Sequence, residues 1–205
     1  FRRVLFRSNP VGKEEAKPTP RERLLLDFGW KFHFGHANDV KKDFGFGEGG
    51  AGGFQKTGNF LAPNHILYND SEWRAVNLPH DWAIELPFLN DPALTSKGSY
   101  PIGREYPETS VGWYRRIFAL APEDAGKRIS IEFDGVYRSA MIICNGFYVG
   151  QHQGGYDSFS FDLTDFVVPG QPNVLLVRVD ATLSDGWFYE GAGRSEEHTS
   201  ELQSP

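Results

Sequence analysis

Residues 128–151, "RISIEFDGVYRSAMIICNGFYVGQ", decide the fold. Ile129, Ile131 and Phe133 alternate with polar residues, which predicts a strand with one buried face. Asn145-Gly146 then separates two apolar runs. This dipeptide is typical of a two-residue β-hairpin turn, in which both central residues have positive φ. The segment therefore predicts antiparallel strands joined by a tight turn.

Short alternating stretches recur on both sides of this segment, at residues 30–34, 112–120, 159–163 and 173–181. Turn signals such as Pro169-Gly170 separate them. Short strands with turns every ten or so residues favour an all-β antiparallel sandwich. We expect no helix longer than a turn or two.

Composition narrows the class of protein. The 205 residues suffice for one domain, and the net charge of -6 argues against nucleic acid as a partner. No stretch approaches the roughly 20 apolar residues of a membrane span. The single cysteine, Cys144, excludes an internal disulfide and leaves the cellular compartment open. Because it lies in an apolar strand, we expect a packed and unreactive thiol.

The two ends share an unusual relation. Residues 194–198, "RSEEH", and residues 4–8, "VLFRS", can be encoded by DNA strings that are reverse complements. The tail also resembles a translated sequencing-library adapter. We therefore expect residues 1–8 and 194–205 to be adapter-derived scars, residues 9–23 to be a linker or lead-in, and the folded domain to span residues 24–193.

A glycine-rich stretch at residues 43–60 contains GxGxxG twice. A phosphate-binding loop of this type requires a preceding strand and a following helix. The residues that follow have no helical pattern, so we expect a mobile surface loop.

Two predicted loops place acidic residues beside tryptophans. One contains Asp81 and Trp82, and the other contains Asp185, Trp187 and Glu190. A sugar site needs this combination, because a carboxylate accepts hydrogen bonds from hydroxyls while an aromatic face covers the C–H side of the sugar. The alternative is structural: the tryptophans belong to the core and the acids cap turns.

The stretches "WRAVNLPHDWAIE", "SVGWYRRIF", "NVLLVRVDA" and "DGWFYEGAG", together with residues 131–166, occur in one order. They resemble the N-terminal sugar-binding domain of glycoside hydrolase family 2, and most closely that of bacterial β-galactosidases. The resemblance implies a jelly-roll β-sandwich like that of galactose-binding domains. It also implies that an immunoglobulin-like domain and a catalytic barrel follow in the full-length chain.

The resemblance further implies a retaining β-glycosidase that hydrolyses terminal β-galactosides, with both catalytic glutamates in the barrel. We therefore expect this chain to be inactive alone. The alternative is a free-standing carbohydrate-binding module. No organic cofactor or metal site is implied for these residues, and a full-length protein of this family can form homo-oligomers.

The resemblance also implies which residues contact the sugar. Asp81 matches a position that hydrogen-bonds the terminal sugar in the family. Near "DGWFYEGAG", some relatives have an acidic residue where this chain has Trp187. Either Asp185 or Glu190 substitutes for it, or Trp187 stacks on the sugar.

Overall fold

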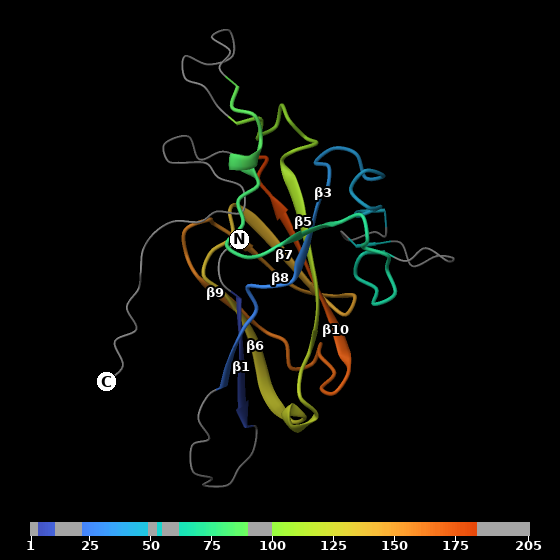
Figure 1. Ribbon diagram of the computed structural model, residues 1–205, viewed down its shortest axis with the longest axis vertical. Helices are drawn as coiled ribbons and strands as arrows, with labels where there is room; N and C mark the ends of the chain where they lie inside the picture. Colours follow the sequence, from blue (N-terminus) through green and yellow to red (C-terminus); the bar gives the residue numbers. More distant parts are fainter. Residues whose placement is uncertain (1–3, 11–21, 49–52, 55–61, 90–99, 184–205) are drawn as a thin grey trace.

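The computed structural model describes residues 4–10, 22–48, 53–54, 62–89 and 100–183. Within them the chain forms two antiparallel sheets (Figure 1). The strands are β1 (Val4–Pro10), β2 (Glu22–Leu25), β3 (Trp30–Phe34), β4 (Arg74–Val76), β5 (Val111–Ala119), β6 (Lys127–Phe133), β7 (Ser139–Cys144), β8 (Phe147–Gln153), β9 (Phe159–Asp162) and β10 (Pro172–Asp180).

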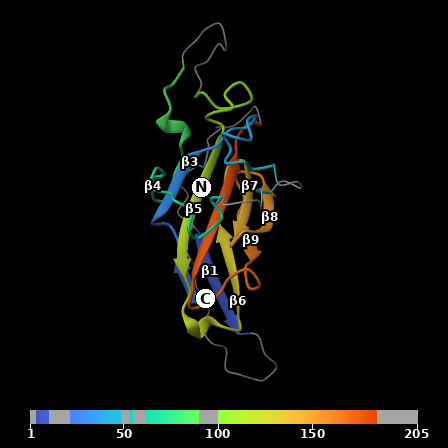
Figure 2. The same cartoon turned by 90° about the vertical axis from the view of Figure 1, so that its right-hand side faces the viewer.

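The smaller sheet has the order β2-β1-β6-β9 and the larger sheet the order β4-β3-β5-β10-β7-β8. Figure 2 shows the strands of the two sheets running roughly along the long axis of the domain. The helical elements of the described residues are two short 3-10 turns, η1 (Ala83–Glu85) and η2 (Pro122–Asp124), and none of these residues forms an apolar helix long enough to cross a membrane. The predicted all-β sandwich is confirmed.

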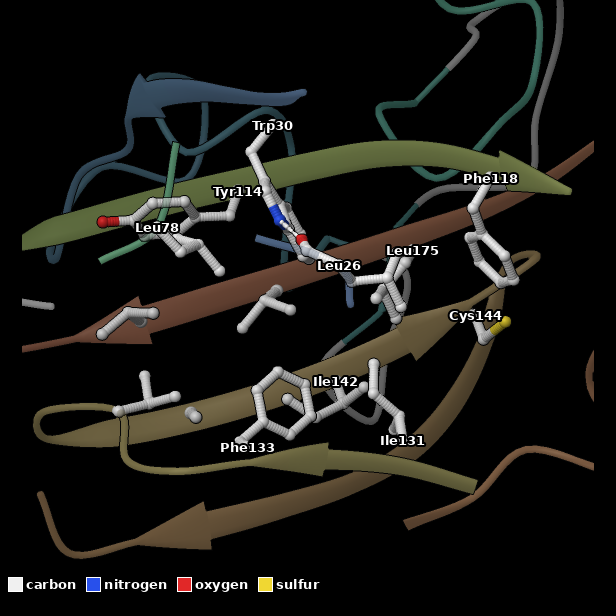
Figure 3. Close-up of a cluster of buried hydrophobic side chains, with 14 of the residues drawn as sticks. Leu26, Trp30, Leu78, Tyr114, Phe118, Ile131, Phe133, Ile142, Cys144 and Leu175 are labelled. Atoms are coloured by element: carbon white, nitrogen blue, oxygen red, sulfur yellow. Dashed lines mark hydrogen bonds between the residues drawn. The ribbon is translucent and has the colours of Figure 1, made fainter. Parts of the chain in front are cut away.

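The core lies between the sheets (Figure 3). Ile129, Ile131 and Phe133 of β6 point into it, as their alternation predicts. Leu175 of β10 and Cys144 of β7 meet them from the larger sheet. Cys144 is fully buried, which confirms the packed thiol, and burial raises the pKa of the thiol to about 12, which disfavours the reactive thiolate.

The predicted hairpin turn joins β7 to β8. Asn145 has φ 49° and Gly146 has φ 85°, so both central residues lie in the left-handed region. The Asn145 side chain donates from Nδ2 to the carbonyl of Phe166 at 2.8 Å and to Oδ1 of Asn173 at 2.7 Å. The turn is therefore fixed by its backbone and by polar contacts with Phe166 in the β9–β10 connection and with Asn173 of β10.

The N-terminal residues differ from our expectation, because regular structure begins before Leu24. β1 lies between β2 and β6, with Phe6 opposite Ile131. An unpaired edge of β6 would expose a row of N–H and C=O groups, and an apolar segment such as "VLF" suits a strand there. The pairing does not bear on where residues 1–8 originate. Their adapter origin stays a prediction, and sequencing the source DNA across both ends tests it.

The connection between β3 and β4 covers the outer face of the larger sheet. In the described part of the glycine-rich stretch, Phe46 and Phe54 pack on Trp113. Asp43 accepts hydrogen bonds from Trp113 Nε1 at 2.6 Å and from Arg178 Nε at 2.9 Å. This part of the stretch is therefore a packed second layer, unlike the mobile surface loop that we expected.

Candidate functional site

Residues 77–86, which include η1, form the first part of the connection between β4 and β5 and lie near the upper end of the sandwich in Figure 1. Asp81 lies in this segment and is 6% exposed. Its Oδ1 accepts a hydrogen bond from the backbone N–H of Ala83 at 2.9 Å, which fixes the start of η1. A carboxylate offers about four acceptor positions, so one group can hold a turn and also accept from a hydroxyl.

Trp82 has a packing role. Its ring is 0% exposed, and Nε1 donates to the carbonyl of Thr109 at 2.8 Å. It packs on Phe32 with the ring centroids 5.5 Å apart. A Cβ at Gly112 would lie 2.8 Å from both rings, so the close approach requires glycine. In this arrangement Trp82 presents no face to a sugar, which agrees with the structural alternative for this residue.

His80, next to Asp81, is 8% exposed and contacts a row of side chains across three strands. Arg74 of β4, Phe32 of β3 and Tyr114 of β5 lie opposite one another in the sheet register. His80 Nδ1 is 2.7 Å from Tyr114 Oη, and Nε2 is 2.8 Å from an Arg74 nitrogen. The imidazole also packs edge-on against Phe32, with the centroids 4.9 Å apart.

Glu85 of η1 completes this group. Its Oε2 lies 2.5 Å from the Arg74 guanidinium, and its Oε1 lies 3.3 Å from His80 Nε2. Burial lowers the pKa of His80 to about 4, with Glu85 acting to raise it and Arg74 to lower it further. The imidazole is therefore neutral at neutral pH. Arg74 can only donate, and its contact with Nε2 at 2.8 Å is shorter than that of the Glu85 acceptor at 3.3 Å, so it favours the tautomer that carries its proton on Nδ1 and donates to Tyr114.

The second predicted loop begins at the same end of the sandwich. The backbone N–H of Ala181, just after β10, donates to the carbonyl of Ser110 at 2.8 Å. Ser110 follows Thr109, whose carbonyl accepts from Trp82. Asp185, Trp187 and Glu190 lie outside the described residues, so their roles stay predictions.

Sequence reasoning selected Asp81 but missed its neighbours. His80, Arg74, Glu85 and Tyr114 carry no spacing that marks them as a group, since Tyr114 is 34 residues from His80. The only signal was that the polar pair His80-Asp81 precedes a tryptophan. Among the residues that the structure describes, no three His, Cys, Asp or Glu side chains gather as metal ligands would.

Double-sheet β-sandwiches are found among lectin domains, which bind sugars. The chain matches the family described as "Glycosyl hydrolases family 2, sugar binding domain" over residues 29–193. It therefore belongs to the sugar-binding domains of glycoside hydrolase family 2.

Individual relatives agree with this assignment. The chain is 38% identical over 177 residues to the β-galactosidase BoGH2A of Bacteroides ovatus, covering 85% of this chain and 17% of that protein. It is 36% identical over 117 residues to a β-glucuronidase of Bacteroides fragilis, covering 57% of this chain and 15% of that protein.

A solved structure of a glycosyl hydrolase family 2 member from Bacteroides cellulosilyticus matches with a TM-score of 0.58 and 31% identity. That match covers 82% of this chain and 19% of the other. The chain thus spans about a fifth or less of the relatives that it matches.

Proposed function

We propose that the chain is the N-terminal sugar-binding domain of a retaining β-glycosidase that hydrolyses terminal β-galactosides. The 38% identity to a β-galactosidase over most of the chain supports this substrate class. In this proposal an immunoglobulin-like domain and a barrel with two catalytic glutamates about 5 Å apart complete the enzyme. The chain alone contributes no catalytic residue.

One observation carries the proposal: Asp81 is held in a fixed loop at one end of a sandwich that belongs to this family. We propose that its carboxylate accepts hydrogen bonds from hydroxyls of the terminal sugar. Asp185 or Glu190 would supply a second polar contact, or Trp187 would stack on the sugar. Trp82 would act by packing beneath the loop, since its ring is fully buried.

The test uses the full-length enzyme that carries this domain. We expect Asp81→Ala to lower kcat/KM for an aryl β-galactoside by about 10- to 100-fold, because a hydrogen bond to a charged group contributes about 1.5–3 kcal/mol. Glu123→Ala, which alters an exposed acid of η2 beyond the other end of β5, is the control and should leave kcat/KM unchanged. An unchanged kcat/KM in the Asp81 variant would overturn the proposed contact.

A second candidate substrate is a β-glucuronide, because the chain is 36% identical to a β-glucuronidase. Comparing kcat/KM of the full-length enzyme on aryl β-galactoside and aryl β-glucuronide decides between the two. We expect the galactoside to be preferred, and a preference for the glucuronide would replace the proposed substrate.

The free-standing binding module is tested with this chain. One or two hydrogen bonds do not offset the entropy lost on association, so we expect no measurable heat when galactosides are titrated into it. Useful affinity of the isolated chain for a sugar would favour the module.

A further inference from the structure

His80 attaches the Asp81 loop to the larger sheet at three points. Its two ring nitrogens contact the ends of the cross-strand row, Tyr114 and Arg74, and its ring edge packs on the middle member, Phe32. The Arg74 guanidinium also lies over the Phe32 ring, 5.3 Å from its centroid. Because all three contacts are to residues of strands, His80 is held in a fixed position relative to the sheet.

The loop is also held on the other side of Asp81. Glu85 is bound to Arg74, and Asp81 caps the N–H of Ala83 within the same turn. Asp81 thus sits between two residues, His80 and Glu85, that both contact Arg74. A carboxylate between two such attachments has little freedom to reorient, and a fixed acceptor binds a hydroxyl without an ordering cost.

We propose that His80 is a positioning residue, which together with Tyr114, Arg74 and Glu85 orients the Asp81 carboxylate toward the terminal sugar. This inference rests on the proposed function, in which Asp81 contacts the sugar. His80 itself acts only through Asp81. The neutral state of the imidazole supports this role, because a neutral ring can donate to Tyr114 Oη from Nδ1 while it accepts from Arg74 at Nε2.

A double-mutant cycle in the full-length enzyme tests the coupling. We expect His80→Phe, which keeps a ring but removes both hydrogen bonds, to lower kcat/KM for an aryl β-galactoside by about tenfold, chiefly through KM. In the background of Asp81→Ala, the same substitution should lower kcat/KM no further. His80→Gln, which keeps polar groups within reach of Arg74, should recover part of the loss.

Tyr114→Phe provides a second route if His80→Phe does not fold. It removes only the hydroxyl that His80 Nδ1 contacts, and we expect a smaller loss of kcat/KM that also disappears in the Asp81→Ala background. Tyr148→Phe is the matched control, because the Tyr148 side chain is exposed on β8. It should leave kcat/KM unchanged.

The possible results separate the two proposals. If Asp81→Ala has no effect, the proposed sugar contact fails, whatever the His80 variants do. If Asp81→Ala has its expected effect but the losses from the His80 and Asp81 variants multiply, only the positioning role is overturned. A His80 variant that lowers the melting temperature and leaves kcat/KM intact would likewise reduce His80 to a structural residue.

Discussion

Two regions of the domain rely on different kinds of contact. The inter-sheet core is filled by apolar side chains that alternate along strands, such as Ile131 and Phe133. The segment at residues 77–86 packs Leu78, Trp82 and Ala83 into the same core, and it is also held by hydrogen bonds and ion pairs from His80, Asp81 and Glu85. Non-directional burial tolerates small shifts of a side chain, whereas hydrogen bonds fix both distance and angle. The domain thus combines an apolar scaffold with a polar loop whose geometry is more narrowly set.

The largest effect on stability is expected in the scaffold. Phe133 is 0% exposed and stacks on Phe159, with the ring centroids 4.9 Å apart. Phe133→Ala should lower the free energy of unfolding by about 3–5 kcal/mol, because it removes buried surface and leaves a cavity. Urea unfolding of the chain measures this loss.

Phe147→Ala is the matched control for the core substitution, since Phe147 is 61% exposed. We expect it to change the free energy of unfolding by less than about 1 kcal/mol. Equal losses in the two variants would mean that β6 does not carry the core as described.

The same difference between the two regions explains which parts of the structure the sequence could predict. Alternation at Ile129, Ile131 and Phe133 marks a buried strand face locally, so seven of the strands could be placed from short windows. The polar group around His80 joins β4, β3 and β5 with the loop, and no short window contains all of its members. Of the residues in this region, Asp81 could be selected as an acid beside a tryptophan and through a resemblance to a family, but not through its contacts.

The glycine-rich stretch that packs on the outer face of the larger sheet differs from the predicted mobile loop for a related reason. Glycines at residues 45–53 lower the helical and strand propensity of the stretch, which favours a loop. The interaction that holds it joins Asp43 to Arg178, 135 residues away. A long-range ion pair leaves no periodic signal in the sequence, so a packed loop and a mobile loop can have the same sequence pattern.

The polar loop should respond to pH through His80. The pKa of His80 is about 4 in the folded chain, below the ordinary value of 6.5, chiefly because burial disfavours the charged ring. Between these two pH values the unfolded chain binds a proton that the folded chain does not. The contribution of His80 to the free energy of unfolding is therefore fully present above about pH 6.5. It decreases as the pH falls toward 4, by at most about 3 kcal/mol.

A comparison of the wild-type chain with His80→Gln isolates this contribution. Urea unfolding at about pH 7, above this window, and at about pH 4.5, near its lower end, gives the difference in free energy for each protein. The wild type should lose more stability than the variant at the lower pH. An identical pH dependence of the two proteins would show that His80 does not stay neutral in the fold.

The smallest effect is expected at the β7–β8 turn, which lies outside both regions and reports on backbone conformation alone. Gly146 has φ 85° and is exposed, with the nearest atom to an added Cβ 3.7 Å away on Asn64. Gly146→Ala should therefore cost about 1 kcal/mol of stability, from the left-handed conformation and not from a clash. Gly146→Asn should cost less, because asparagine tolerates this conformation better. Urea unfolding of both variants measures the difference, and equal stability of the alanine variant and the wild type would mean that the turn does not require a positive φ at this position.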